Sequence, residues 1–279
     1  MSLEDLPPLR AALESHGLMA KKALGQNFLL DLNITRKIVR LTGPFDDASV
    51  VLEVGPGPGG LTRALLETGA TVVAIEKDAR FLPLLEELAA ASGGRLNVIH
   101  DDALAVDGQA LLAPWAEGRP LSIVANLPYN VGTPLLIKWL TGPLRPRAMG
   151  LMFQKEVARR IVARVGDADY GRLAVIAQAV CETEIVMDLP ARAFTPPPKV
   201  DSAVVLLKPR EIRPEAHVLV ALQTVTAAAF GQRRKMLRSS LKPLGGAALC
   251  ETVGLDPDRR AETAPVEAFL ALAAQVAGR

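Results

Sequence analysis

A polar and aromatic segment, Asn126–Tyr129, directly follows the apolar run Leu121–Ala125, which is typical of a buried strand. The Asn126 side-chain oxygen and a neighbouring main-chain carbonyl can each accept one N–H of an exocyclic amine. Pro128 restricts the backbone, so the two acceptors keep a fixed geometry, and the Tyr129 ring can stack on a flat heterocycle. The segment therefore predicts a site that turns the lone pair of an aromatic amine toward an electrophile.

A glycine-rich stretch upstream indicates where a cofactor would bind. The apolar run Val50–Val54, interrupted by Glu53, leads into Gly55-Pro56-Gly57-Pro58-Gly59-Gly60 and then into a helical pattern. Glycines there let the backbone approach a ligand closely at a helix N-terminus. A second apolar run, Thr71–Ile75, ends at Glu76, and an acid at that distance suits the hydroxyls of a ribose.

A third apolar run, Leu96–Ile99, is followed by the acids Asp101 and Asp102. A carboxylate at this position could accept the amino group of an adenine, or it could simply cap the following turn. Its place after a glycine-rich loop and a ribose-type acid favours the ligand role.

Two cofactors fit the glycine pattern. Gly55-x-Gly57-x-x-Gly60 followed by Glu76 matches the dinucleotide fingerprint literally, so these residues alone favour NAD and S-adenosylmethionine about equally. Glu53 inside the strand, the prolines between the glycines and the distant Asn126 segment favour S-adenosylmethionine. A dehydrogenase has no use for an amine-binding segment at its fourth strand.

Separated motifs carry a family resemblance from about Lys21 to the C-terminus. They are Gly25–Leu29, Glu53–Gly57, Asn126–Asn130, Gln154–Val157, Tyr170–Leu173, Phe194–Ser202 and Ala229–Lys235. Each motif is weak alone, but in this order they are specific, and together they resemble the ribosomal RNA adenine N6,N6-dimethyltransferases.

The resemblance implies both the fold and the reaction. It implies an α/β, Rossmann-like class I methyltransferase sheet of seven strands, the last one reversed, with a small all-α C-terminal domain. It also implies S-adenosyl-L-methionine-dependent dimethylation of N6 on two adjacent adenosines near the 3′ end of 16S rRNA. The partner would be an immature small ribosomal subunit, with a role in its biogenesis.

The resemblance also assigns roles to residues. A loop carrying Asn27 and Leu29 would fold over the cofactor, and the Asp-Ala pattern selects Asp102 over Asp101 as the adenine ligand. The cofactor residues are Asn27, Leu29, Gly55, Gly57, Glu76, Asp102 and Asn126. The catalytic residues are Asn126, Leu127, Pro128, Tyr129 and Phe194.

Phe194 has two interpretations. It precedes Pro196-Pro197-Pro198, a rigid arm without backbone donors, so its ring could stack on the second face of an adenine opposite Tyr129. It could equally pack beneath the proline-rich loop. The resemblance favours stacking.

Composition changes along the chain predict its organisation. Strand and helix patterns alternate from Ser49 to Val205, which indicates a parallel α/β sheet. We expect a methyltransferase domain over residues 1–210, with residues 1–20 peripheral, and a helical domain over 211–279 that contacts RNA. The segment 172–181 fits a helix or a long strand, Ile185–Met187 and Val204–Leu207 fit an antiparallel pair, and 233–241 fits a helix.

The net charge is only +2, so basic residues matter where they cluster. Arg233, Arg234, Lys235 and Arg238 precede Lys242 with almost no acids nearby, which favours contact with RNA phosphates over a solvated helix surface. For the cluster Arg159–Arg164 the solvated surface is favoured.

The cysteines, the histidines and the apolar runs of the sequence exclude several classes of protein and site. The two cysteines and three histidines share no metal-type spacing, so we expect no disulfide framework and no metal site. The N-terminus lacks the features of a signal peptide, and no apolar run approaches the length of a membrane span. A cytoplasmic monomer is the simplest expectation.

Three alternative functions remain on the sequence. One is a resistance-type adenine methyltransferase of large-subunit rRNA, whose pocket would look the same. Another is a DNA adenine methyltransferase. The third is an RNA-binding ribosome-assembly factor in which methylation is incidental. The Phe230–Lys235 pattern favours the small-subunit enzyme over the first.

Overall fold

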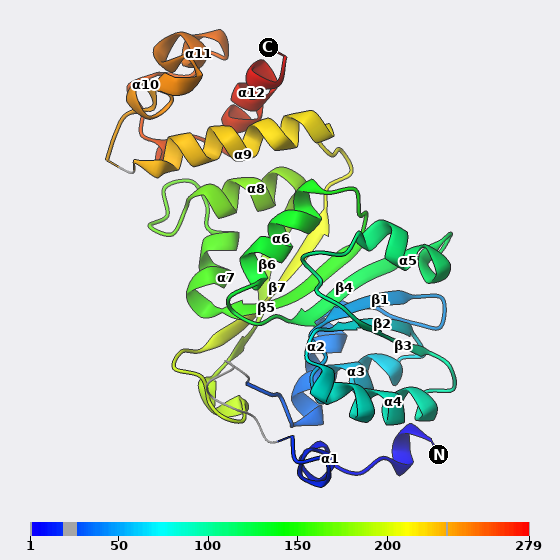
Figure 1. The fold of residues 1–279 in the computed structure, drawn as a ribbon. Coiled ribbons are helices and arrows are strands. Elements are labelled where there is room, and N and C mark those ends of the chain that lie inside the picture. Colours follow the sequence, from blue (N-terminus) through cyan, green and yellow to red (C-terminus); the bar gives the residue numbers. More distant parts are fainter. Residues whose placement is uncertain (1, 19–26, 233, 279) are drawn as a thin grey trace. The chain divides into compact units, whose positions relative to one another are not determined.

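The computed structural model describes residues 2–18, 27–232 and 234–278 (Figure 1). Contacts divide the chain into two compact units. Unit 1 comprises Met1–Leu136, Pro143–Ala158 and Ile185–Leu206, and unit 2 comprises Ile137–Gly142, Arg159–Glu184 and Leu207–Arg279. This division groups residues 159–184 with the C-terminal helices. The boundary expected at residue 210 instead divides the chain once, into 1–210 and 211–279. That domain boundary stays a prediction.

A seven-stranded sheet with order β3-β2-β1-β4-β5-β7-β6 runs through the described residues. Its strands are β1 Val50–Val54, β2 Thr71–Glu76, β3 Leu96–His100, β4 Leu121–Asn126, β5 Ala148–Gln154, β6 Cys181–Leu189 and β7 Ser202–Pro209. Strands β3, β2, β1, β4 and β5 pair in parallel, and β7 is antiparallel. The expected class I methyltransferase sheet with a reversed last strand is confirmed.

The central strands are apolar runs without alternation because helices cover both faces of a parallel sheet. Every residue of β1 is buried, as are all of β2 after Thr71 and all of β4 before Asn126. Since paired parallel strands end at the same edge, this arrangement brings the residues after β1, β2 and β4 together.

In unit 1, α1 Leu9–Ser15 and α2 Leu32–Thr42 precede the first strand. The helices α3 Gly60–Leu66, α4 Leu82–Ala91 and α5 Gly108–Ala116 follow β1, β2 and β3. Figure 1 shows α2, α3 and α4 together on one side of β1–β3. Asp31 caps α2 by accepting the Asn33 N–H at 2.8 Å, as its position in the sequence predicts.

Unit 2 is held by aromatic and aliphatic packing among its helices. Its helices include α8 Arg172–Val180, α9 Ala216–Gly231, α11 Gly246–Thr252 and α12 Val266–Ala277. The helices α6 Gly132–Thr141 and α7 Lys155–Val162 each have residues in both units. The Phe230 ring lies 6.1 Å from Tyr170 and 5.3 Å from Phe269. The Tyr170 hydroxyl donates to the Ala264 carbonyl at 3.1 Å, so this motif residue belongs to the core of unit 2.

Of the two alternatives for segment 172–181, the helix is observed, from Arg172 to Val180, and strand β6 begins at Cys181. The helix expected over 233–241 is wrong, because only α10, Leu237–Ser240, is helical among the described residues 234–241. Met236 instead pairs with Arg260 as an isolated β-bridge, and the Leu237 N–H donates to the Arg259 carbonyl at 2.8 Å. These pairings use the backbone groups that a longer helix would need.

Gly150 in β5 provides a test of this packing. A Cβ there would lie 2.6 Å from Thr42 Cβ on α2 and closer still to its Cγ2. We expect Gly150→Ala to lower the free energy of unfolding by about 1–3 kcal/mol, because the helix must shift away from the sheet. Gly231→Ala is the matched control, since a Cβ at Gly231 meets nothing within 4 Å. Urea unfolding of both variants gives the comparison, and equal stabilities would contradict the close α2–β5 contact.

Candidate active site

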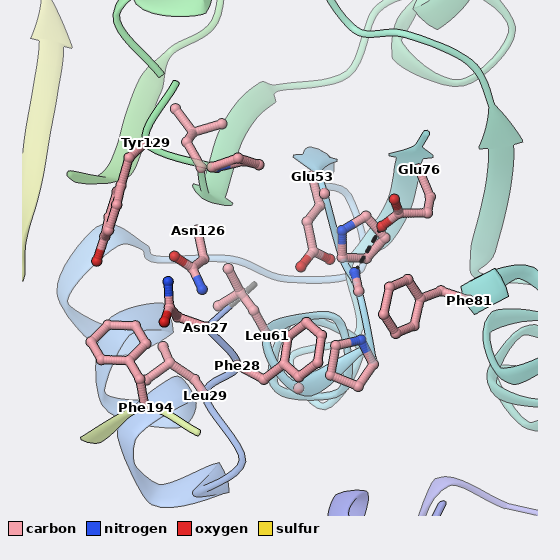
Figure 2. Close-up of a pocket in the computed structure, with 17 residues that line it drawn as sticks. Asn27, Phe28, Leu29, Glu53, Leu61, Glu76, Phe81, Asn126, Tyr129 and Phe194 are labelled. Carbon is pink, nitrogen blue, oxygen red and sulfur yellow. Dashed lines mark hydrogen bonds between the residues drawn. The ribbon is translucent and has the colours of Figure 1, made fainter. Parts of the chain in front are cut away.

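A pocket lies in unit 1 at the carboxyl ends of β1, β2 and β4 (Figure 2). Most predicted site residues line it, although they come from five separate segments. The lining residues are Asn27, Phe28, Leu29, Glu53, Gly55, Pro56, Gly57, Pro58, Gly60, Leu61, Glu76, Phe81, Asn126, Leu127, Pro128, Tyr129 and Phe194. The structure therefore brings these predicted residues together around one pocket, while the role of each residue stays a prediction.

The glycine turn after β1 forms one wall. Gly55 and Gly57 have φ values of +70° and +51°, which side chains rarely adopt. Their N–H groups donate to the end of β2, Gly55 to the Ile75 carbonyl and Gly57 to Glu76 Oε2, both at 2.9 Å. The turn is thus fixed against the neighbouring strand, and its glycine backbone, together with Pro56 and Pro58, lines the pocket.

Glu76 closes the end of β2. Besides the Gly57 bond, its Oε1 accepts the Asp78 N–H at 2.8 Å, and its side chain is buried. Burial raises the pKa of Glu76, and the two main-chain donors oppose that shift. A carboxylate has about four acceptor sites, so capacity remains for the hydroxyls of a ribose.

Glu53 is a buried acid in the middle of β1 that faces the same pocket (Figure 2). Its Oε2 atom is buried without a hydrogen-bond partner. Burial raises the pKa of Glu53 to about 8, with the Thr62 hydroxyl opposing the shift and Glu76 adding to it. One oxygen of this carboxyl is therefore open to a ligand, and a positive charge nearby, such as that of S-adenosylmethionine, would favour the ionised carboxylate.

The segment 27–29 covers the pocket from another side. Phe28 forms a two-hydrogen-bond bridge with Thr195, at 3.0 and 2.9 Å, and its ring meets Phe81 edge-on at 5.5 Å. A Cβ on Gly60 would lie only 2.6 Å from the Leu29 carbonyl, so the segment and the glycine turn approach closely. The preceding residues of the Gly25–Leu29 motif, Gly25 and Gln26, lie outside the described residues.

The segment after β4 supplies the predicted amine-binding groups. Asn126 is half-buried, and Figure 2 shows its amide pointing into the pocket. Leu127 is buried, Pro128 is exposed, and the hydroxyl of half-buried Tyr129 lies 2.9 Å from Ser202 Oγ. The amide is therefore available to a ligand instead of being turned into the core.

Phe194 combines both interpretations drawn from the sequence. Its side chain is only 4% exposed and packs in the hydrophobic core of unit 1, yet it also lines the pocket. Figure 2 shows it at the same end of the pocket as Tyr129. Stacking on a base stays a prediction.

Asp102 is not among the described residues that line the pocket. Its Oδ2 pairs with Lys77 Nζ at 2.8 Å, and its Oδ1 accepts the Leu104 N–H at 2.9 Å, as a turn cap would. The predicted contact of Asp102 with an adenine amine stays a prediction.

The predicted RNA-binding residues form a separate group in unit 2. Arg233 lies outside the described residues, and Arg234 and Lys235 are exposed in a turn. Arg238 is also exposed and pairs with Asp258 at 3.0 Å. The described residues contain no cluster that could hold a metal ion, and no described helix is long and apolar enough to cross a membrane.

Several pocket residues were not predicted as site residues. Phe28 lies inside a motif whose neighbours were chosen, and Leu61 follows the glycines directly. Phe81 has no sequence signal, because it reaches the pocket only through the turn after β2. Its side chain is fully enclosed against Phe28.

The sheet order and a glycine-walled pocket at its carboxyl edge define a class I methyltransferase. The family model described as ribosomal RNA adenine dimethylase matches residues 17–277. A ribosomal RNA small subunit methyltransferase A from Phenylobacterium zucineum is 67% identical over 273 residues, covering 98% of this chain and 94% of that protein. The chain belongs to the ribosomal RNA adenine dimethylase family.

Solved structures agree with this fold. A dimethyladenosine transferase from Plasmodium falciparum matches with a TM-score of 0.71 and 25% identity, covering 87% of this chain and 94% of the other. The 23S rRNA methyltransferase ErmE matches with a TM-score of 0.66 and 25% identity, covering 90% of this chain and 99% of the other.

The buried acid predicts a pH dependence of stability. In the unfolded chain a glutamate titrates near pH 4.3, whereas the folded pKa of Glu53 is about 8. The folded state therefore holds a proton that the unfolded state has lost, and Glu53 lowers stability progressively as pH rises from about 4.3 toward 8. Glu53→Gln removes this term, so the variant should lose less stability over that range, by up to about 1.4 kcal/mol per pH unit. Urea unfolding at a series of pH values tests it, and parallel profiles for the two proteins would contradict it.

Proposed function

We propose that this chain dimethylates the N6 amine of adenosine in small-subunit 16S rRNA, with S-adenosyl-L-methionine as methyl donor. Family membership and a relative of 67% identity, named for the small subunit, support the substrate class. The single observation that carries the chemistry is the pocket itself. It presents the Asn126 amide and an aromatic ring beside a glycine turn that faces a buried, unpartnered acid.

The residues present fit the methyl donor. When bound, S-adenosylmethionine supplies an electrophilic methyl group on a positively charged sulfur. The glycine turn would accommodate it without side-chain clashes, and Glu76 would accept hydrogen bonds from its ribose. Asn27 and Leu29, on the segment that covers the pocket, would limit water access.

The target adenine must leave its stack to enter this pocket, at a cost of a few kcal/mol. Stacking on Tyr129, and on Phe194 from the other side, would return about 1–3 kcal/mol per base contact. Asn126 Oδ1 and the Leu127 carbonyl would then accept the two N6 hydrogens. This directs the nitrogen lone pair toward the methyl group, so positioning and electrostatics carry the rate. The released proton would pass to water.

The large-subunit alternative is weaker on the comparisons. The 23S rRNA methyltransferase ErmE shares the fold but only 25% identity, against 67% for the small-subunit relative. The assembly-factor alternative is compatible with the same fold. It differs from the proposed function because subunit maturation would then depend on RNA binding and not on methylation. We infer that the partner is an immature small ribosomal subunit. We also infer that the enzyme acts in the cytoplasm.

A methyl-acceptance assay separates these functions. Purified small and large ribosomal subunits lacking adenosine dimethylation, and duplex DNA, are each incubated with the protein and labelled S-adenosylmethionine. We expect label in the small-subunit rRNA, with mass mapping finding N6,N6-dimethyladenosine at two adjacent positions. Label confined to the large subunit, or to DNA, would refute the proposed function.

Asn126→Ala tests the amine-binding role. We expect methylation to fall by at least about 100-fold, because the target amine loses one of its two orienting acceptors. The matched control is Asn33→Ala, an exposed asparagine in the first turn of α2. The readout is the rate of single-turnover methyl transfer to small-subunit rRNA. A rate within threefold of the control would show that the amide does not orient the amine.

Lys235→Ala tests the RNA-contacting surface of unit 2. Removing one phosphate contact should weaken rRNA binding and reduce the slope of log affinity against log salt by about 1. Arg160→Ala is the control, because Arg160 is an exposed base of the cluster interpreted as solvated surface. Filter binding over a range of salt concentrations measures both slopes. Identical slopes for the two variants would show that Lys235 does not contact an rRNA phosphate.

A further inference from the structure

The tip of the Tyr129 ring is held by a residue from a distant part of the chain. The two hydroxyl oxygens, Tyr129 Oη and Ser202 Oγ, lie 2.9 Å apart. Tyr129 follows β4 and is half-buried, whereas Ser202 is the first residue of β7 and is fully buried at 0% exposure. Ser202 is absent from the described residues that line the pocket, whereas Tyr129 is among them, so the Tyr129 ring connects Ser202 to the pocket.

Ser202 is itself held in a fixed position. The carbonyl of its neighbour Asp201 accepts the Lys155 N–H at 2.9 Å, which ties the start of β7 to the end of β5. The Asp201 side chain accepts the Ala191 N–H, also at 2.9 Å. Ala191 begins the short helical turn that leads directly to Phe194. Residues 201 and 202 therefore contact both Tyr129 and the turn that leads to Phe194.

The hydrogen bond restrains a motion that packing leaves open. Rotation about χ1 carries a half-exposed tyrosine ring between staggered wells and moves its hydroxyl end through a wide arc. A hydrogen bond at the hydroxyl end of the ring opposes this rotation. Figure 2 shows the Tyr129 and Phe194 rings at the same end of the pocket, where such rotation would alter the space between them.

We propose that Ser202 is a positioning residue for the target adenine, fixing the position of the Tyr129 ring through the hydroxyl–hydroxyl hydrogen bond. This inference rests on the proposed function, because the stacked base is the substrate of that reaction. Ser202 does not touch the reacting atoms. It sets the position of the ring against which the base lies.

The second methyl transfer should depend on this restraint more than the first. Unmethylated N6 has two hydrogens and can engage both acceptors, whereas monomethylated N6 has only one. Its orientation then relies more on stacking. A loosened Tyr129 ring should therefore leave a larger share of product at the monomethyl stage.

The experiment compares Ser202→Ala, Tyr129→Phe and the double variant on small-subunit rRNA lacking adenosine dimethylation. Each single variant should lower kcat/KM for rRNA by roughly threefold to tenfold, the size expected for one neutral hydrogen bond, and raise the ratio of monomethyl to dimethyl product. The kcat/KM of the double variant should be no lower than that of the less active single variant, because both changes break the same hydrogen bond. Calorimetry should show S-adenosylmethionine affinity within twofold of the unaltered protein.

Ser92→Ala is the matched structural control. Ser92 is also a buried serine, at 1% exposure, and its hydroxyl bonds Ala89, Arg95 and Leu96 at the end of α4. We expect this variant to lower Tm while leaving the product ratio unchanged. Tyr129→Phe breaks the Ser202 bond without changing the buried serine, so the proposal can be tested even if Ser202→Ala does not fold.

Two results would overturn the inference. One is a wild-type product ratio in both single variants. The other is additive losses in the double variant, which would mean that the two hydroxyls act independently. Both require that the unaltered protein methylates the small subunit. Absence of that activity would instead refute the proposed function.

Discussion

The hydrogen bonds between the glycine turn and the end of β2 are the constraint on which the site depends. Parallel pairing of β1 with β2 brings Gly55 beside Ile75 and Gly57 beside Glu76, and both N–H groups are used there. With these donors engaged, the turn keeps left-handed conformations at Gly55 and Gly57, where no side chain extends into the pocket. A bulkier turn would fill the space that a cofactor needs.

The other walls of the pocket are built around that turn by segments distant in the chain. The Leu29 carbonyl approaches Gly60, Phe28 pairs with Thr195, and Tyr129 bonds Ser202. Because Thr195 follows Phe194, the segment 27–29 is joined directly to the part of the pocket wall that carries Phe194. The Oε2 atom of buried Glu53 has no partner, and a bound ligand could supply one.

Much of the fold and the pocket could be predicted because their signals are local. Continuous apolar runs mark β1, β2 and β4, and the residues directly after them become the pocket walls. Contacts that depend on tertiary structure could not be predicted. No sequence pattern marks Phe81 as a pocket residue, and the Phe194–Ser202 motif does not show that Ser202 contacts Tyr129. The helix expected from 233 to 241 is shortened to Leu237–Ser240 by the pairing of Met236 with Arg260. Asp102 was chosen by resemblance, but here it pairs with Lys77 outside the pocket lining.

The most direct test of the account is a structure of the protein bound to S-adenosylmethionine or its demethylated product together with an adenosine-containing fragment of small-subunit rRNA. The account predicts that N6 of an extruded adenine lies within hydrogen-bond distance of Asn126 Oδ1 and the Leu127 carbonyl, with the base against Tyr129 and the cofactor against the glycine turn. An adenine bound elsewhere, with Asn126 contacting neither ligand, would contradict it.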